Sequence, residues 1–404
     1  MTSKRDSRKS KQAADWDPVC PEALSDPKSV HNELRQKCPV AFSGNWGGFY
    51  TLTKYEDIVN ASHDSETFTA TRQTVIPTSP RKGLPRLPLQ ADPPEHDFYR
   101  AGLNVFFKEN KMREMESKLK ILAQDLIEKL LLTENPFEFS DGFAAPFTQA
   151  SLCLLVGLDL SEADRLGELS HRYVDAVQNE DTSTAGELSA QIDQFAIDLV
   201  ADRKAQLRDP ETDMVSGLMK MEIDGRKYTD REIAGIIRLG LIGGHVVPKN
   251  FLSSVAYHLS NDLSFQHRLR EEPALMRPAI EELLRFYSPN QALVRRTTKE
   301  VKVRGRTIPD DSPVALLFLS ANFDEEVFDE PEKFEPERAP NRHIAFGIGP
   351  HVCVGQSLAR MQTRLTIDAL LDNTSEFTLH DQPKWARWTE FGVSELYLDF
   401  TPCD

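Results

Sequence analysis

The sequence predicts a mainly α-helical fold that carries small β-sheets. Apolar residues recur with helical spacing through several long segments, whereas the segments with strand character are short. No linker rich in proline, glycine or serine divides the chain after residue 18. A length of 404 residues by itself favours about two or three domains, but without a linker we expect one large domain over residues 19–404.

The expected elements follow one another along the chain, and no repeat of fixed period interrupts them. Thr229 and Glu232 form a capping-box pattern that marks the start of a long helix. Other helices are predicted over residues 111–132, 147–156, 162–178, 185–206, 279–287 and 356–371. Strands are predicted over residues 47–52, 301–303, 314–319 and 396–400.

The first eighteen residues differ from the rest of the chain. Basic residues stand there among small polar ones, which is typical of a disordered tail: Lys4, Arg5, Arg8, Lys9 and Lys11. The whole chain is acidic, with 63 Asp and Glu against 48 Lys and Arg. This excess of negative charge argues against nucleic acid and anionic membranes as partners, so we expect a soluble partner.

Neither the apolar runs nor the cysteines indicate a membrane or extracellular protein. No apolar run reaches the roughly 18 residues of a membrane span, and the N-terminus lacks the apolar core of a signal peptide. The cysteines form no CxxC pair and are odd in number, which favours a reducing cytoplasm and argues against structural zinc: Cys20, Cys38, Cys153, Cys353 and Cys403.

One glycine-rich segment carries the strongest chemical signal. Phe346 stands seven residues before Cys353, with Gly347 and Gly349 between them and Gly355 just after. Glycines there can adopt the positive-φ conformations of a tight turn, so that backbone N–H groups point at one sulfur. The helix expected from residue 356 favours the thiolate. We interpret Cys353 as the ligand of an iron in a flat cofactor; the alternative is a buried structural cysteine.

With these spacings the segment resembles the haem-binding loop of the cytochrome P450 haem-thiolate monooxygenases. The resemblance extends from about Trp16 to Phe400. It implies a prism-shaped fold with haem b (iron protoporphyrin IX) between a long oxygen-side helix and the cysteine-side helix, and a further helix over residues 55–62. Phe346 then covers the sulfur side of the macrocycle, and Gly355 lets the backbone approach it. Membrane-bound members carry an apolar anchor, so the chain resembles the soluble bacterial type.

A second motif is the pair Glu282 and Arg285, which lie on one face of the helix expected over residues 279–287. An exposed pair of this kind contributes only about 0.3–0.5 kcal/mol and is common on surfaces. The family joins a glutamate and two arginines in a buried network at the matching positions, where Arg338 is the third member. The resemblance therefore implies that the three residues support folding and the haem pocket, not chemistry.

Haem carries two propionates, which an enclosing protein must match with cations or hydrogen-bond donors. His96 and Arg100 are four residues apart and so share one face of a helix. The resemblance makes both residues propionate ligands and adds Arg295 and His351. The alternative for each residue taken singly is a solvated surface charge.

The oxygen-side helix departs from the family pattern of glycine, a variable residue, an acid and a threonine. Here the run is Gly243, Gly244, His245, Val246, Val247 and Pro248. By resemblance the two glycines form the groove for dioxygen, while Val246 replaces the acid and Val247 the alcohol of a proton relay. Neither valine transfers a proton, so the catalytic positions 243, 244, 246 and 247 lack the usual donors.

Three alternative proton routes stay open: water ordered on backbone that Pro248 frees, a polar group of the substrate, or peroxide in place of dioxygen. Pro248 lacks an N–H and is expected to kink the long helix. The family often has a histidine at the variable position, pointing away from haem. We therefore favour no direct catalytic role for His245.

The substrate-contacting segments implied by the resemblance are residues 72–90, 173–192, 239–247, 290–294 and 391–394. Residues nearest the iron predict a mostly apolar pocket: Leu239, Gly243, Val247, Ala292, Leu293 and Val393. Such a pocket favours a compact hydrophobic or aromatic substrate. The first segment adds polar residues that contact a polar substrate group or are simply solvated: Arg72, Gln73, Arg81, Lys82 and Arg86.

Electrons have to come from a separate protein, because 404 residues leave no room for a fused reductase. The resemblance places five basic residues on the cysteine side: Lys108, Lys111, Arg113, Arg360 and Arg364. They suit the docking of an acidic ferredoxin or flavodoxin with its NAD(P)H-dependent reductase; the alternative is ordinary surface charge. We expect a cytoplasmic monomer that activates dioxygen and inserts one oxygen atom into a small hydrophobic or aromatic molecule. The alternatives are a peroxide-driven peroxygenase, an oxidative-coupling enzyme and a non-catalytic haem-binding protein.

Overall fold

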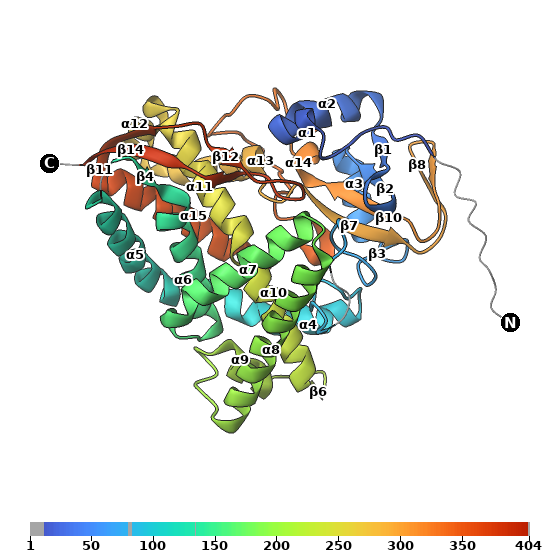
Figure 1. The fold of residues 1–404 in the computed structure, drawn as a ribbon, viewed down its shortest axis with the longest axis horizontal. Coiled ribbons are helices and arrows are strands. Elements are labelled where there is room, and N and C mark those ends of the chain that lie inside the picture. Colours follow the sequence, from blue (N-terminus) through green and yellow to red (C-terminus); the bar gives the residue numbers. More distant parts are fainter. Residues whose placement is uncertain (1–11, 80–82, 134, 403–404) are drawn as a thin grey trace.

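The helical architecture with small sheets is confirmed by the computed structural model, which describes residues 12–79, 83–133 and 135–402 (Figure 1). Long helices occupy the left and centre of Figure 1, and the largest sheet lies on the right. The helices are α1 (Pro21–Ser25), α2 (Pro27–Lys37), α3 (Tyr55–His63), α4 (Glu95–Asn104), α5 (Glu109–Leu131), α6 (Ala145–Val156), α7 (Ala163–Gln178), α8 (Thr182–Ala205), α9 (Met214–Lys220), α10 (Asp230–Gly243), α11 (Val246–Ser260), α12 (Leu263–Glu271), α13 (Met276–Tyr287), α14 (Phe318–Ala321) and α15 (Gln356–Asn373).

The largest sheet joins strands from distant parts of the chain in the order β1-β2-β10-β7-β3. β10 pairs with β2 in parallel and with β7 antiparallel, which places Leu316 opposite Leu293. Smaller sheets are β11-β14-β4, β12-β13, β5-β6 and β8-β9. The strands are β1 (Val40–Ser43), β2 (Phe49–Leu52), β3 (Phe68–Thr69), β4 (Phe137–Glu138), β5 (Glu222–Ile223), β6 (Arg226–Lys227), β7 (Ala292–Thr297), β8 (Val301–Val303), β9 (Arg306–Ile308), β10 (Pro313–Leu317), β11 (Thr374–Leu379), β12 (Lys384–Trp385), β13 (Val393–Glu395) and β14 (Tyr397–Pro402).

Two hydrophobic clusters hold these elements together. The larger one contains buried side chains of α11 and α15, such as Leu252 and Ile367. The smaller one lies around the largest sheet and contains Leu52 and Val294. Because full burial of one such side chain contributes roughly 1.5–3 kcal/mol, the two clusters fix the helices and the sheet that carry the expected site residues.

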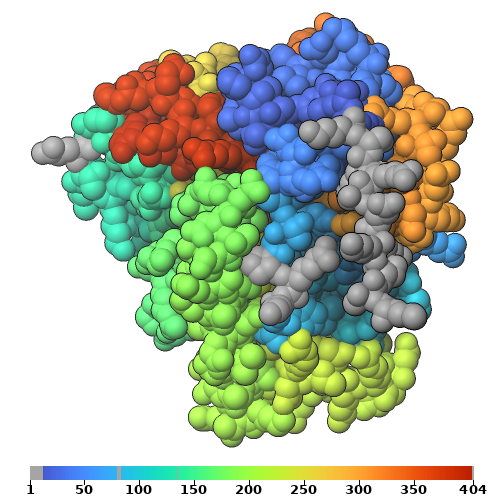
Figure 2. All heavy atoms as spheres, turned by 45° about the vertical axis from the view of Figure 1, so that its right-hand side comes forward, coloured from blue at the N-terminus to red at the C-terminus, as the bar shows by residue number. Residues whose placement is uncertain are grey.

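The packed part of the chain begins before the boundary that composition predicts at residue 18. Trp16 is buried, and its ring centroid lies 5.7 Å from that of Trp388. The amide of Phe42 donates to the Asp15 carboxylate (2.7 Å). Figure 2 shows the C-terminal segment (red) beside the N-terminal helices (dark blue). Residues 12–18 are therefore part of the fold, and the disorder expected of residues 1–11 lies outside the described residues.

The long helix expected from residue 229 is interrupted. α10 starts with the predicted capping box, ends at Gly243, and is followed by α11 from Val246. Pro248 is the third residue of α11 and has no N–H, so the carbonyl of Gly244 has no helical donor four residues on. The predicted kink is thus a break in the helix, located at Gly244 and His245.

One predicted strand ends early. β10 stops at Leu317, and Phe318–Ala321 forms α14 in place of the last residues of the strand expected over 314–319. A short apolar run does not distinguish a strand from a buried helical turn, which explains the error. In the described part of the chain, no helix combines the length and the apolarity that crossing a membrane requires.

Candidate active site

The cysteine loop is a tight turn that depends on its glycines. Gly347 (φ 73°) and Gly349 (φ 77°) lie in the left-handed region, where other residues are strained. A Cβ atom on Gly349 would stand 2.9 Å from the backbone oxygen of Ser62. The amide of Cys353 donates to the carbonyl of Phe346 (2.8 Å) and closes the turn. α15 begins three residues after the cysteine.

The Cys353 side chain is accessible although it lies deep among protein atoms. The residue is exposed, yet burial by the surrounding protein raises the pKa of its thiol. An accessible sulfur in such surroundings faces an internal surface, not bulk solvent. The Gly355 amide and the charges of Arg100 and Arg360 lower the thiol pKa, but burial is the larger effect. A stable thiolate here needs a further positive charge beside it, such as a metal ion.

The four expected propionate ligands are neighbours in space. Burial, followed by the charges of Arg295, His96 and Arg100, lowers the pKa of His351 to about 3. The ring centroids of His96 and His351 are 4.4 Å apart. Arg100 also donates to the carbonyl of Val352, which ties α4 to the cysteine loop.

Several polar atoms of this cluster have no partner within the described chain. The Nε2 atoms of His96 and His351 are buried without a hydrogen bond. Arg295 is 3% exposed and donates to the carbonyl of Val294 (3.0 Å); no carboxylate of the described residues lies within ion-pair distance of it. Burial lowers the pKa of Arg295 to about 10, although the charge of Asp92 raises it. Buried cations and unpaired donors in one place fit an anionic group with several acceptor oxygens, as the two carboxylates of haem would provide.

An open strip runs along α10, the helix at the centre of Figure 1. A Cβ atom on Gly240 or Gly243 would meet no atom within 4 Å. Gly243 is exposed, and Leu239, Gly240 and Val247 are half-buried. Leu239 and Gly243 are four residues apart and share one face of α10, so the strip leaves room above its glycines.

Val246 and His245 lie away from this strip. Both line a groove of about 360 Å³ between α6, α7 and the start of α11. The Nδ1 atom of His245 is 3.1 Å from the Ser170 hydroxyl, which itself donates to the carbonyl of Leu241 (2.7 Å). Burial lowers the pKa of His245 to about 4, so the ring is neutral at physiological pH.

The six expected pocket residues do not behave alike. Leu239, Gly243, Val247 and Leu293 keep accessible surface. Ala292 and Val393 are fully buried in the hydrophobic clusters, so the expectation that they line the pocket is wrong for this structure.

The polar residues expected to border the pocket have partners in the protein. Arg72 pairs with Asp311 (3.1 Å), and Arg86 donates to the Tyr173 hydroxyl (3.2 Å). The Gln73 carbonyl oxygen accepts from Arg296 (2.9 Å). Arg81 and Lys82 lie outside the described residues.

Glu282, Arg285 and Arg338 meet in a buried network. Glu282 is fully buried, and its two oxygens accept from Nε and Nη2 of Arg285 at 2.8 Å each. Arg338 Nε donates to the same carboxylate (3.1 Å), as does Asn341 Nδ2 (3.0 Å). Arg285 also donates to the Asn322 carbonyl (2.9 Å), so the network ties α13 to the segment before the cysteine loop.

Glu281, a second acidic residue of α13, forms an ion pair that the sequence did not predict. Arg360 donates to both oxygens of Glu281 (2.6 and 2.8 Å), and His343 Nε2 lies 3.0 Å from it. Although burial opposes ionisation, the hydrogen bonds from Arg360 and His343 lower the pKa of Glu281 to about 2. Arg360 also lies over the Phe346 ring (4.8 Å). The neighbouring Glu282 motif was the signal in the sequence, but it does not reveal which residue Glu281 contacts.

The basic residues expected to form a docking patch are mostly paired with carboxylates. Lys111 binds Glu211 (2.8 Å), and Arg113 binds Glu109 (2.5 Å). Arg364 pairs with Glu116 and Asp368, and Arg360 is engaged by Glu281 as described above. The cysteine side therefore presents mixed charge instead of a free basic patch.

Comparison with known proteins places most of the chain in one family. The family model for cytochrome P450 matches residues 25–394. A steroid C26-monooxygenase of Mycobacterium tuberculosis is 30% identical over 377 residues, which are 91% of this chain and 99% of that protein. Linalool 8-monooxygenase of Pseudomonas putida is 26% identical over 369 residues, 87% of this chain and 90% of that protein.

Solved structures support the same fold. A cytochrome P450 from Chondromyces apiculatus superposes with a TM-score of 0.84 at 23% identity, over 95% of this chain and 97% of that one. The family uses haem b as its cofactor, and the buried donors around the cysteine loop fit that group. This chain therefore belongs to the cytochrome P450 family and is an oxidoreductase of the monooxygenase type.

Proposed function

We propose that Cys353 is the axial ligand of the haem iron. Its support is the accessible sulfur deep in the protein, in a loop whose positive-φ glycines hold it at the start of α15. Phe346 and Gly355 complete the cysteine side. The two propionates are bound by the cluster of unpaired donors: His96, Arg100, Arg295 and His351. Bound in this way, haem supplies the capacity to activate dioxygen.

The substrate is a small, mostly hydrophobic or aromatic molecule, which the enzyme hydroxylates or oxidises in a related way. The observation that carries this proposal is the open strip on α10, whose accessible residues are all apolar or glycine. Steroids and linalool, the substrates named for the two relatives, are both hydrophobic molecules. An apolar strip beside the cofactor binds such molecules by burying their surface.

The residues of the site have separate tasks. Gly243 leaves room for dioxygen and substrate together with Gly240, which takes the place of the expected Gly244, because a Cβ on Gly244 would stand 3.2 Å from the Leu152 side chain. Val247 excludes water and donates no proton. Glu282, Arg285 and Arg338 hold the segment before the cysteine loop in place. Electrons come from a ferredoxin or flavodoxin with its NAD(P)H-dependent reductase, which docks on the mixed-charge cysteine side of a monomer.

A spectral titration tests this function. Haem-loaded protein is titrated with linalool and with testosterone while the visible absorption of the haem is followed. A substrate that enters the strip is expected to shift the main absorption band, and NAD(P)H with the redox partners is expected to give a product heavier by one oxygen atom. Absence of a product from every hydrophobic probe that shifts the spectrum would contradict the proposal.

Ligation is tested separately by substituting cysteines. Cys353→Ala is expected to abolish the spectrum that a thiolate gives in the reduced carbon monoxide complex. Cys153→Ala is the matched control, because Cys153 is buried in the helical cluster away from the loop. An unchanged spectrum in the Cys353 variant would reject the ligand assignment.

A peroxide-driven oxidation is the second candidate, because Val246 and Val247 stand where the family has its acid and alcohol. Hydrogen peroxide brings its own protons, so this reaction does not need the missing donors. Product formed with hydrogen peroxide but not with NAD(P)H and redox partners would favour the peroxygenase over the monooxygenase.

A further inference from the structure

A buried carboxyl group lies beside the helix that lacks its acid. Glu390 is 7% exposed and lies between β12 and β13. Asn250 of α11 donates from Nδ2 to Glu390 Oε2 (2.9 Å). Among the described residues no donor contacts Oε1, and Oε1 is not one of the buried polar side-chain atoms that lack a hydrogen-bond partner. One oxygen of the carboxyl group is therefore free to bind water.

Asn250 places this carboxyl group close to the helix break. It follows Val247 by three residues, so it lies on the same side of α11 as Val247, about 4.5 Å further along the axis. The turn after Glu390 packs tightly against α11, since a Cβ on Gly392 would stand 2.9 Å from the backbone oxygen of Asn250. Asn250, whose amide binds the carboxyl group, is thus about one helical turn from Val247.

The surroundings of Glu390 keep it protonated in part near neutral pH. Burial raises the pKa of Glu390 to about 7, and the hydrogen bond from Asn250 opposes this shift. The facing groups are neutral: Gln291 donates to its carbonyl (2.7 Å), and its amide donates to the carbonyl of Arg387 (2.9 Å). The Arg387 side chain points to Asn179 instead.

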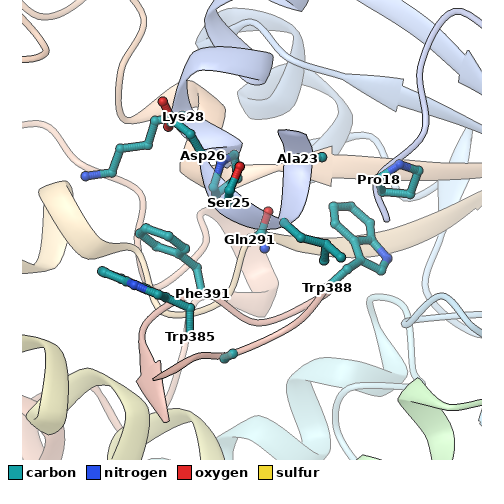
Figure 3. A pocket seen from close by; sticks show the side chains of 12 residues that line it. Pro18, Ala23, Ser25, Asp26, Lys28, Gln291, Trp385, Trp388 and Phe391 are labelled. Atoms are coloured by element: carbon teal, nitrogen blue, oxygen red, sulfur yellow. The ribbon is translucent and has the colours of Figure 1, made fainter. Parts of the chain in front are cut away.

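A cavity leads from the surface to residues beside Glu390 (Figure 3). It has a volume of about 170 Å³ and is lined on one side by exposed Ser25 and Asp26 and on the other by Gln291 and Phe391. Lys28 also lines it, with its ammonium 3.5 Å from the centre of the Phe286 ring, and burial lowers the pKa of Lys28 to about 7. The cavity is large enough to hold water beside Gln291 and Phe391, which are neighbours of Glu390.

His245 is the other buried titratable group at the break, and its geometry argues against it as a donor. It bonds to Ser170 and lines the groove beside α6 and α7, away from the strip, and it carries no extra proton at neutral pH.

We propose that Glu390 donates the protons consumed in oxygen activation, in place of the acid and threonine that are Val246 and Val247 in this chain. The inference rests on the proposed monooxygenase function. Insertion of one atom of dioxygen consumes two electrons, which NAD(P)H supplies through the redox partner, and two protons, and it releases one water. Each proton leaves the Glu390 carboxyl through Oε1 to a bridging water, and the carboxylate regains a proton from solvent through the cavity.

The first test follows the carboxyl group itself. Glu390→Gln keeps an oxygen for Asn250 and removes the proton, while Glu395→Gln is a matched change on the same hairpin, where Glu395 pairs with Lys384 (2.7 Å). Infrared spectra of haem-loaded protein without substrate are recorded between about pH 5 and pH 9. We expect a band of a buried protonated carboxyl group that disappears near pH 7 in the wild type and in Glu395→Gln and is absent from Glu390→Gln. A band that persists in Glu390→Gln, or does not titrate, overturns the inference.

The second test measures oxygen consumption with a ferredoxin, its reductase and NADPH, again without substrate. Glu390→Gln is expected to reduce oxygen about 10²-fold more slowly than the wild type, whereas Glu390→Asp regains part of the rate. The wild-type rate is expected to fall as the pH rises through 7, and that of Glu390→Gln to show no such step. A merely structural role would leave the pH profile unchanged.

Peroxide separates the two proposals. Oxidation of guaiacol driven by hydrogen peroxide is expected to be equal in the wild type and Glu390→Gln, because peroxide supplies its own protons. Equal oxygen consumption by the two proteins overturns the role of Glu390 and leaves the monooxygenase proposal standing. If the wild type oxidises no organic probe with any oxidant, the proposed function fails, while the infrared titration still reports on Glu390.

Discussion

Replacing Glu282 by alanine is expected to destabilise the protein far more than breaking an exposed pair of the same spacing. The Glu282 carboxylate is fully buried and neutralises Arg285, which has no exposed side-chain surface, and Arg338, whose side chain is 6% exposed. In the variant Arg285 loses its carboxylate and keeps carbonyl oxygens as acceptors, while the only carboxylate that Arg338 keeps among the described residues is the more distant Glu335 (3.8 Å). Removing one partner of a buried ion pair costs about 3–5 kcal/mol.

Thermal unfolding followed by circular dichroism measures this effect. For 404 residues the unfolding entropy is roughly 0.85 kcal/mol per kelvin, so the midpoint is expected to fall by roughly 4–6 °C. The matched control is Glu162→Ala, which removes the carboxylate from Arg165 (3.1 Å), a side chain that is 68% exposed. That change is expected to cost about 0.2–1 kcal/mol, a shift near 1 °C or less. Equal shifts in the two variants would refute the argument that burial sets the strength of the network.

Three further outcomes follow from the site. Gly349→Ala forces a φ of 77° on alanine and brings its Cβ to within 2.9 Å of the Ser62 backbone oxygen, so we expect the protein to lose about 1–3 kcal/mol of stability and to bind less haem. Thermal melting and the haem-to-protein absorbance ratio measure the two effects, and normal values for both would contradict the prediction. Arg295→Leu removes a buried cation that no carboxylate of the described residues contacts, and its burial outweighs the charge of Asp92. The haem-free protein is therefore expected to be no less stable, while haem is lost faster to apomyoglobin; unchanged haem loss would reject the propionate role. Glu390→Gln is expected to stabilise the protein by roughly 3 kcal/mol at about pH 8 and hardly at all at about pH 4. The folded pKa of about 7 exceeds the ordinary 4.5, so the stability contributed by the neutral acid is complete below 4.5 and lost as the pH rises through 7; urea unfolding at both pH values checks the sign.

Local patterns predicted much of this protein because their physical causes are local. The spacing of Gly347, Gly349 and Cys353 sets the backbone conformation of the loop within a few residues, and the structure has the corresponding turn. The missing N–H of Pro248 likewise predicts a disturbance of its own helix. The extent of that disturbance was underestimated, since a kink and a full break depend on how α11 packs.

Burial was the quantity that the sequence could not supply. Glu282 with Arg285 and Glu162 with Arg165 have the same spacing, yet one pair is buried and the other exposed. The packing of Ala292 and Val393 inside the clusters was missed for the same reason. Trp16 shows it as well, because its place in the fold depends on Trp388 at the other end of the chain.

The residues of the chain were thus sufficient to predict a mainly helical P450 fold, its cysteine loop and the absence of the usual acid and alcohol near Val246 and Val247. The tertiary structure alone brought Glu390 to Asn250, 140 positions away in sequence. Hydrophobic spacing and turn chemistry act over a few residues, whereas the pKa of a carboxyl group is set by the atoms that surround it after folding. The cysteine loop could therefore be predicted from the sequence, whereas the candidate proton donor was found only in the folded structure.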